Sequence, residues 1–236
     1  MLQAALNGDR SPGRHPALPV SPEALAADAA ACVEAGAGAI HLHPRDARGR
    51  ETLDASVVDA VARHVRAACG VPVGVTTGAW IEPDLERRLA AIAGWSEPDY
   101  SSVNLSEDGS ERVMAALLEA GVGIEAGVAS VEDADRLAAS GLASQVVRVL
   151  VEPYDPDPDE AGAVVAAIHT ALDRHRVAAP RLQHADGAST WVVIADAVQR
   201  GLDTRVGLED TLTLPGGSRA DGNAALIAAA RAMGAL

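Results

Sequence analysis

The sequence is poor in aromatic residues. It contains no Phe, two Tyr and three Trp, although 48% of its residues are hydrophobic and many of these are Ala or Val. Ala favours helices and Val favours strands, so the composition predicts helices that alternate with buried strands. Trp80, Trp95 and Trp191 are too scattered in the sequence to form a surface that stacks nucleotides, and we expect them to be packing residues.

Cysteine and long apolar runs are also scarce. Cys32 and Cys69 stand far apart and neither belongs to a C-x-x-C pair, which predicts free thiols in a reducing compartment. No run of about 18 apolar residues is present, so no transmembrane helix is expected. The first residues resemble a strand and lack the basic start of a signal peptide. We therefore expect a cytoplasmic protein that does not bind membranes.

Basic residues are fewer than acidic residues. The chain has 19 basic and 33 acidic residues, and its formal net charge is −14. An acidic surface repels phosphate backbones, so the charge excludes nucleic acid as the expected partner. It does not exclude an anionic small ligand, because a local basic pocket can override the overall field.

Strand-like and helix-like segments alternate eight times, about thirty residues apart. The predicted strands are Leu2–Leu6, Ala39–Pro44, Val71–Thr77, Tyr100–Leu105, Gly123–Val128, Val146–Glu152, Arg181–Ala185 and Thr204–Leu208. Eight such units predict an α/β fold, a (β/α)8 or TIM barrel, formed by residues 1–236 as a single domain. An open doubly wound sheet is the alternative, but no G-x-G-x-x-G follows the first strand.

Polar residues end the predicted strands, where the active site of such a barrel lies. The most informative motif is His41-Leu42-His43 at the end of the second strand. Residues two apart on a strand point to the same side, so both imidazoles would face the barrel mouth and could form half of a zinc site. The alternative is a pair of histidines held by hydrogen bonds alone.

The eighth strand ends in a pair of acids. Glu209 and Asp210 follow an apolar run directly, so one carboxylate could complete the metal site while the other acts as an acid or base. Capping of the last helix is the alternative. The Thr76-Thr77-Gly78 stretch could bind a carboxylate or form an ordinary turn. The proline-rich segment Glu152–Pro158 is expected to form a shaped wall of the pocket.

At this point the chain resembles the β-keto acid cleavage enzymes, the family of 3-keto-5-aminohexanoate cleavage enzyme. The resemblance spans nearly the whole chain, and H-L-H combined with R-V-G-L-E-D is its most specific part. It is carried by Asn7-Gly8, by the segment from Leu18 to the His41/His43 motif, by Thr76-Thr77-Gly78, by Arg205–Asp210 and by Asn223-Ala224.

The resemblance implies a zinc-bearing (β/α)8 barrel that assembles as a homo-oligomer, usually a homotetramer. It implies that His41, His43 and Glu209 bind the metal, zinc or another divalent cation. It implies catalytic roles for Asp210 as the base, for Arg205 and for Glu125. The residues that it places around the substrate are Asn7, Arg10, Thr76, Thr77, Gly78, Ser102 and Asn104.

The implied reaction couples a β-keto acid with acetyl-CoA and yields acetoacetate and a new acyl-CoA. Where the founding enzyme has a glutamate that recognises an amino group, this chain has Arg10, which predicts a substrate with a second carboxylate or another polar acid. Two alternatives remain. One is a zinc hydrolase that uses His184 and Asp186 as further metal or base residues, and the other is a non-catalytic metabolite-binding barrel.

Overall fold

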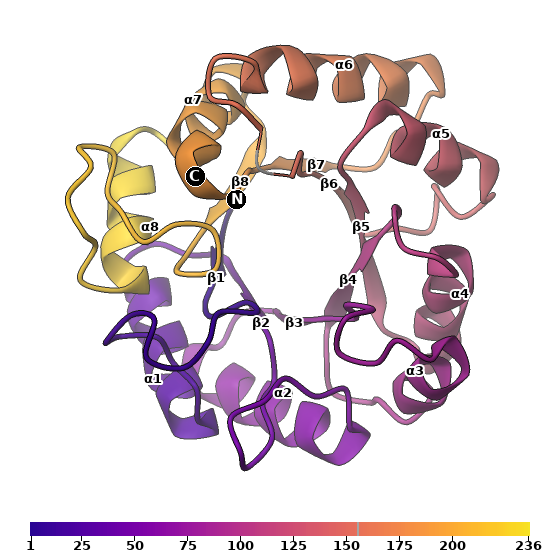
Figure 1. Cartoon of the computed structure of the whole chain (residues 1–236), viewed down its shortest axis with the longest axis vertical. Helices are drawn as coiled ribbons and strands as arrows, with labels where there is room; N and C mark the ends of the chain where they lie inside the picture. The colour runs from indigo at the N-terminus through magenta and orange to yellow at the C-terminus, as the bar shows by residue number, and fades with distance from the viewer. Residues whose placement is uncertain (155) are drawn as a thin grey trace.

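The computed structural model describes residues 1–154 and 156–236. Eight parallel strands pair in chain order, and the first also pairs with the last, so that they form a closed barrel (Figure 1). The predicted (β/α)8 fold is therefore confirmed, and the open doubly wound alternative is wrong. The strands are β1 (Leu2–Ala5), β2 (Ala39–Leu42), β3 (Val73–Thr76), β4 (Tyr100–Asn104), β5 (Gly123–Val128), β6 (Arg148–Val151), β7 (Arg181–Gln183) and β8 (Asp203–Val206).

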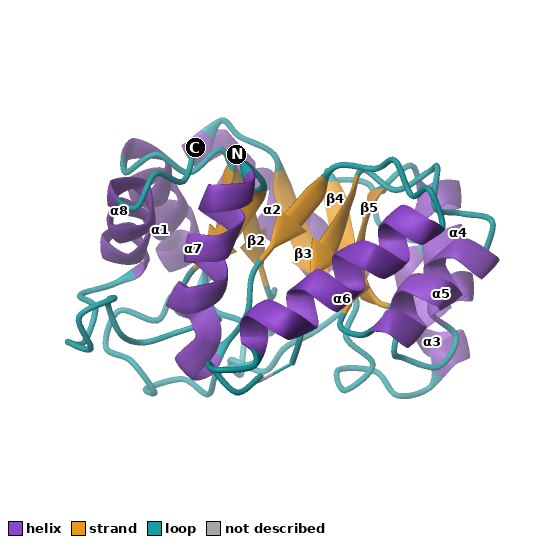
Figure 2. Cartoon of the chain, turned by 90° about the horizontal axis from the view of Figure 1, so that it is seen from above, coloured by secondary structure: helices purple, strands orange, loops and turns teal. Residues whose placement is uncertain are grey.

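The described residues form eight α-helices. These helices surround the strands, as the axial view and the view turned by 90° both show (Figures 1 and 2). They are α1 (Pro22–Glu34), α2 (Ala55–Cys69), α3 (Leu85–Ile92), α4 (Ser110–Ala120), α5 (Val131–Ala139), α6 (Ala161–Arg174), α7 (Thr190–Arg200) and α8 (Asn223–Ala232), and a short 3-10 turn, Gly187–Ser189, precedes α7. None of the helices described is long and apolar enough to cross a membrane.

Local sequence explains where the helices begin and end. Ser21 caps α1 by accepting a hydrogen bond from the backbone N–H of Ala24, and Pro22 opens the helix as predicted. Ser130 caps α5 in the same way through the N–H of Asp133. Gly70 ends α2 in the left-handed conformation that glycine adopts without strain. These signals place each helix between its two strands and so fix the alternation.

The hydrophobic core lies between the strands and the helices. On β1, Leu2 and Ala4 face outward into this core, while Gln3 and Ala5 occupy the alternate positions that point into the barrel. The same alternation on other strands directs Glu125, Arg148 and Arg205 inward. The barrel interior is consequently polar, whereas barrels of this kind are usually filled by Val, Ile and Leu.

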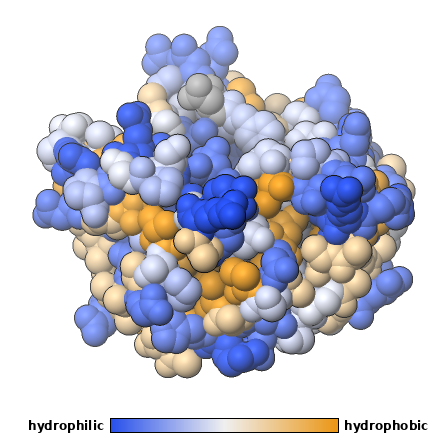
Figure 3. Space-filling model, turned by 60° about the horizontal axis from the view of Figure 1, so that its bottom comes forward, coloured by the Kyte–Doolittle hydropathy of each residue, from blue (hydrophilic) through white to orange (hydrophobic). Residues whose placement is uncertain are grey.

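The outer surface mixes polar and small apolar residues. Figure 3 shows hydrophilic side chains spread over one face, with hydrophobic ones grouped between them. Scattered apolar exposure of this kind is normal for a folded chain. Cys32 is buried and Cys69 is half-buried, and both are free thiols, as predicted.

Candidate metal centre and active site

A cavity of about 430 Å³ opens at the carboxyl ends of the strands. Its walls come from residues at or just after the ends of β2, β3, β4, β6, β7 and β8. This is the end of the barrel at which the sequence predicted the active site. The cavity therefore brings together side chains that lie far apart in the sequence.

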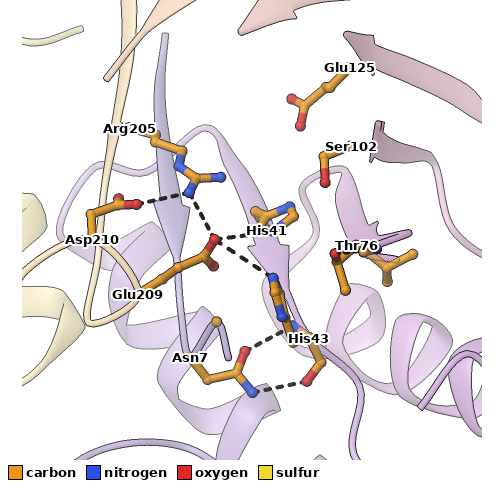
Figure 4. A network of polar contacts seen from close by, with 12 residues as sticks. Asn7, His41, His43, Thr76, Ser102, Glu125, Arg205, Glu209 and Asp210 are labelled. Atoms are coloured by element: carbon orange, nitrogen blue, oxygen red, sulfur yellow. Dashed lines mark hydrogen bonds and ion pairs between the residues drawn. The ribbon is translucent and has the colours of Figure 1, made fainter. Parts of the chain in front are cut away.

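His41, His43 and Glu209 meet in this cavity (Figure 4). Glu209 Oε1 lies 3.6 Å from His41 Nε2 and 3.7 Å from His43 Nε2, and one ligand atom from each residue lies within 4.8 Å of the others. These distances are too long for hydrogen bonds. They are close to the roughly 3.4 Å that separates two ligand atoms placed around one tetrahedral zinc ion.

The chemistry of this cluster fits a divalent cation. Glu209 Oε2 is buried and has no hydrogen-bond partner among the described residues. Two imidazoles and one carboxylate form a ligand set of catalytic zinc, which keeps a further position open for substrate. The geometry therefore agrees with the first of the two sequence interpretations, although it does not identify an ion.

His43 is fixed from three sides. Its Nδ1 lies 2.6 Å from Glu51 Oε1, and its ring stacks against Trp80 with an interplanar angle of 27°. Asn7 bonds to the backbone of His43 at both ends of its amide, donating to the carbonyl oxygen at 3.0 Å and accepting from the N–H at 2.9 Å. A carboxylate on the far nitrogen of an imidazole orients the ring toward a metal.

Arg205 connects the two acids of the last strand. Its Nη2 donates to Glu209 Oε1 and to Asp210 Oδ1, each at 2.8 Å. Asp210 Oδ2 is buried and has no hydrogen-bond partner among the described residues. One carboxylate thus faces the imidazoles while its neighbour points to another part of the cavity, as the sequence predicted for such a pair.

Burial and neighbouring charges shift the protonation equilibria of the cluster. Burial lowers the pKa of His41 to about 3 in spite of the nearby Glu209. Burial acts in the same direction on His43, but Glu209 and Glu51 outweigh it and raise the pKa of His43 to about 9. At Glu209 burial acts to raise the pKa, but the charges of Arg205 and of the two imidazoles outweigh it. The pKa of Glu209 therefore falls well below its usual value. Burial raises the pKa of Asp210 in spite of Arg205.

His184 and Glu152 form a second polar pair in the cavity. His184 Nε2 lies 3.0 Å from Glu152 Oε2, and His184 Nδ1 lies 3.9 Å from Asp210 Oδ1. Burial raises the pKa of Glu152 to about 8, and burial together with Arg205 lowers the pKa of His184 to about 3. The pair is therefore held by a hydrogen bond in surroundings that disfavour the charged form of both groups.

The structure brings only some of the predicted substrate residues to the cavity. Thr76, Ser102 and Asn104 line it. The other predicted substrate residues, and Glu125, which was predicted to be catalytic, lie outside the set of described residues that line the cavity; the substrate residues among them are Asn7, Arg10, Thr77 and Gly78.

Each of these four substrate positions is held by a different contact. Thr77 Oγ1 donates to the carbonyl of Ser102, and the N–H of Gly78 donates to Thr76 Oγ1. Arg10 donates to the backbone carbonyls of Leu208 and Glu209, so its guanidinium supports the loop after β8. Asn7 holds His43, as described above.

Glu125 lies deeper in the barrel and apart from the cluster of His41, His43 and Glu209 (Figure 4). Its Oε1 accepts a hydrogen bond from Gln3 at 2.8 Å and pairs with Arg148 at 3.2 Å. Burial raises the pKa of Glu125 to about 7, although Arg148 acts against this shift.

Several residues of the site were not found from the sequence. Trp80 is half exposed and lines the cavity, so its interpretation as a packing residue is wrong, whereas Trp95 is buried as expected. The amide of Asn104 donates to Glu107, another residue of the cavity wall. Pro153 and Tyr154 also line the cavity, as predicted for the proline-rich segment Glu152–Pro158, of which Asp155 lies outside the described residues.

One sequence cue could have located Glu51. The Asp46-Ala47-Arg48-Gly49 segment has the composition of a tight turn. In the structure this turn is closed by bonds between Asp46 and Arg50, and a bridge pairs Arg45 with Glu51. A short hairpin therefore returns Glu51 to His43.

Comparison with known proteins gives one family and a shared fold. The model of a family described as beta-keto acid cleavage enzyme matches residues 1–235. A relative from Paraburkholderia graminis, 3,5-dioxohexanoate:acetyl-CoA acetone transferase, is 32% identical over 96 residues. That alignment covers 40% of this chain and 31% of the relative, so it spans about a third of the relative's length.

Two solved structures show the same fold at low sequence identity. The ternary complex of ObcA with C4-CoA adduct and oxalate has a TM-score of 0.72 at 18% identity, covering 92% of this chain and 63% of that one. The 3-dehydroquinate dehydratase of Geobacillus kaustophilus has a TM-score of 0.66 at 14% identity, covering 98% of this chain and 88% of that one.

Proposed function

The chain belongs to the beta-keto acid cleavage enzyme family, and from this premise we propose that it cleaves a β-keto acid with acetyl-CoA as the second substrate. The products would be acetoacetate and the CoA thioester of the remaining acyl group. The observation that carries the proposal is the meeting of His41, His43 and Glu209 beside Asp210 in one cavity. The transferase from Paraburkholderia graminis supports the choice of acetyl-CoA.

We assign the metal to His41, His43 and Glu209, with zinc as the expected ion. A divalent cation in this place supplies a Lewis acid that stabilises negative charge on the oxygens of a β-keto acid. Glu51 and Trp80 would hold the ring of His43 in position, and Asn7 would hold its backbone. Arg205 would hold Glu209 and Asp210 at their observed separation.

Asp210 is our candidate for the general base. Its carboxylate would take the proton from the carbon between the substrate's carboxylate and ketone, and its raised pKa favours that acceptance. The carbanion would attack the acetyl carbon, and the C–S bond of the thioester would break to release the CoA thiolate. The thiolate would then attack the substrate ketone carbon. Cleavage of the neighbouring C–C bond would give the acyl-CoA, and the proton on Asp210 would return to the acetoacetate carbon.

Other polar residues have supporting roles in this proposal. Thr76, Ser102 and Asn104 line the cavity and are candidates to bind the keto acid. Glu125 would act from deeper in the barrel as a positioning residue, because its carboxylate contributes to the field at Arg205. Thr77 and Gly78 would shape the loop after β3, and Arg10 would support the loop after β8.

The hydrolase alternative predicted further metal or base residues after the seventh strand, with His184 and Asp186 as candidates. Among the described residues, the possible metal cluster contains His41, His43 and Glu209, while His184 is directed to Glu152. His184 is therefore not part of the candidate metal cluster, and the family match supports the transferase reaction over hydrolysis. The acids and imidazoles that line the cavity favour a catalytic site over the non-catalytic metabolite-binding barrel.

Mass spectrometry of the reaction products tests the proposal. Purified protein loaded with zinc would be incubated with a panel of β-keto acids and acetyl-CoA. We expect acetoacetate and a matching acyl-CoA in equal amounts, and their loss after chelation and dialysis. Release of free CoA and acetate without acetoacetate would support the hydrolase instead, and full metal occupancy with no product would support the non-catalytic barrel.

A further inference from the structure

The pairing between β1 and β8 becomes irregular just before the candidate ligand Glu209. In the regular part, the N–H of Thr204 donates to the carbonyl of Met1. Continued along both strands, the same pattern would join the N–H of Leu208 to the carbonyl of Ala5. In the structure the N–H of Glu209 donates to the carbonyl of Ala5 instead, at 3.3 Å. This shift by one residue deprives the N–H of Leu208 of its partner on β1.

A side chain from α8 takes the place of the missing contact. Asn223, the first residue of α8, is fully buried. Its Oδ1 accepts from the N–H of Leu208 at 2.6 Å, and its Nδ2 donates to the carbonyl of Leu6 at 2.9 Å. Nδ2 also donates to Asp28 Oδ2, on α1, at 2.6 Å. A side-chain amide offers both an acceptor and donors, so it can join two backbones that no longer pair directly.

The two backbone segments that this amide joins carry the candidate metal site. Leu208 directly precedes Glu209 in the sequence. Leu6 directly precedes Asn7, whose own amide bonds to the backbone of His43 at both ends. The bridging amide is therefore connected on one side to the carboxylate ligand and on the other side, through Asn7, to an imidazole ligand.

The backbones approach each other closely at this place. A Cβ atom on Gly207 would lie 1.8 Å from the carbonyl oxygen of Ala5, and one on Gly8 would lie 2.5 Å from Cγ of Glu209. Glycine at both positions permits the approach. A displacement of either backbone would consequently move the Glu209 carboxylate relative to the imidazoles.

We propose that Asn223 is a positioning residue for the metal centre, because its amide sets how far Glu209 lies from the two imidazoles. The inference rests on the metal site of the proposed function and adds a residue outside the set of described residues that line the cavity. Asp28 keeps the amide in the required orientation, since the reverse orientation would bring its oxygen against a carboxylate and a carbonyl.

The metal affinity of Asn223→Asp tests the inference. This variant keeps the shape of the side chain and the acceptor for Leu208, but it replaces the donor to Leu6 by an oxygen. We expect its zinc affinity, measured by competition with a chelator, to fall by at least about tenfold. The visible absorption of the cobalt(II)-loaded protein should also change, because the ligands around the ion would be displaced. Unaltered affinity and an unaltered spectrum would overturn the inference.

Two further variants separate positioning from fold stability. Leu226→Ala on the same helix removes a fully buried core side chain, so it should lower the thermal midpoint while zinc affinity stays within a few-fold. An equal loss of affinity in Leu226→Ala and Asn223→Asp would overturn the inference. Asp28→Ala removes the half-buried partner of the amide and should lower zinc affinity by a smaller factor. Should Asn223→Asp fail to fold, unaltered affinity in Asp28→Ala would overturn the inference.

Metal binding and turnover together separate this inference from the proposed reaction. Zinc binding by the unaltered protein without acetoacetate from any β-keto acid would count against the reaction, while the ranking of the variants would still decide the inference. Unaltered protein that binds neither zinc nor cobalt would overturn both. Acetoacetate formation by the unaltered protein, combined with full zinc affinity in Asn223→Asp, would retain the reaction and reject the inference.

Discussion

The barrel contains two polar layers that differ in how their charges are balanced. In the lower layer, which lies deeper in the barrel, Glu125 accepts a hydrogen bond from Gln3 and pairs with Arg148, and Gln3 also donates to the Tyr100 hydroxyl. In the upper layer, two imidazoles face Glu209 at distances too long for hydrogen bonds, and only Arg205 balances the acids beside it. In both layers some buried oxygens have no hydrogen-bond partner among the described residues; they are Gln3 Oε1 and Glu125 Oε2 in the lower layer and Glu209 Oε2 and Asp210 Oδ2 in the upper layer. The two layers differ in that the candidate metal ligands, two imidazoles and a carboxylate, converge in the upper layer.

The largest predicted effect concerns Asp210, which we propose as the base of the upper layer. Asp210→Asn keeps the side-chain shape but removes the proton acceptor, so we expect kcat to fall by a factor on the order of 10³. Zinc content and thermal stability should change little, since Glu209 keeps its contacts with the imidazoles and Arg205. Steady-state kinetics and metal analysis of the purified variant check this. Activity within about tenfold of the unaltered enzyme would reject Asp210 as the base.

A second prediction concerns the lower layer and uses pH. The folded state holds the pKa of Glu125 at about 7, above the 4.5 of an ordinary glutamate, so folding binds a proton between these values. The stabilising contribution of the protonated group is complete below about pH 4.5 and is lost as the pH rises through 7. In the unaltered protein this loss should lower the unfolding free energy by about 2 to 3 kcal/mol between pH 5 and pH 8. Glutamine does not titrate, so this part of the pH dependence should be absent from Glu125→Gln.

Denaturant titrations at the two pH values measure this change. The zinc affinity of Glu125→Gln should stay within a few-fold of the original, because Glu125 lies apart from the cluster. Equal pH slopes in both proteins would contradict the assigned shift, and a loss of zinc would show that the two layers are not separate.

The smallest predicted effect concerns a residue that supports the upper layer from outside. Glu51→Gln weakens the hold on His43 Nδ1 but leaves all three candidate ligands in place. Changes of this kind reduce metal affinity by about 10- to 100-fold. Competition with a chelator measures the affinity directly, with Glu119→Gln as the control for loss of one negative charge. Equal affinity in the two variants would show that Glu51 does not orient the ring.

Much of the fold could be predicted from periodic sequence patterns. All eight predicted strands are present, with each bound within two residues of the one observed, because apolar runs and helix caps are local features. The convergence of His41 and His43 with the acids after the eighth strand also followed from strand alternation and from the rule that strand ends meet at one end of a barrel, whereas the choice of Glu209 over Asp210 as the candidate ligand came from the family resemblance.

The loops could not be predicted in the same way. Trp80 reaches the cavity because Gly78 and the loop after β3 let it fold over His43, and Arg10 turns to backbone carbonyls instead of substrate. Such paths depend on contacts between segments distant in the sequence. A residue type alone therefore indicated what a side chain can do, but not which group it would meet.

The pairing of β8 with β1 has a consequence for how a cation would be held. His41 and His43 come from the second strand, whereas Glu209 follows the last, so the three ligands lie on opposite sides of the seam that closes the ring. A bound ion would therefore cross-link the first and last parts of the barrel through its ligands. Transient parting of the first and last strands would withdraw the carboxylate, and the exchange rate of the ion would then report how often the barrel opens.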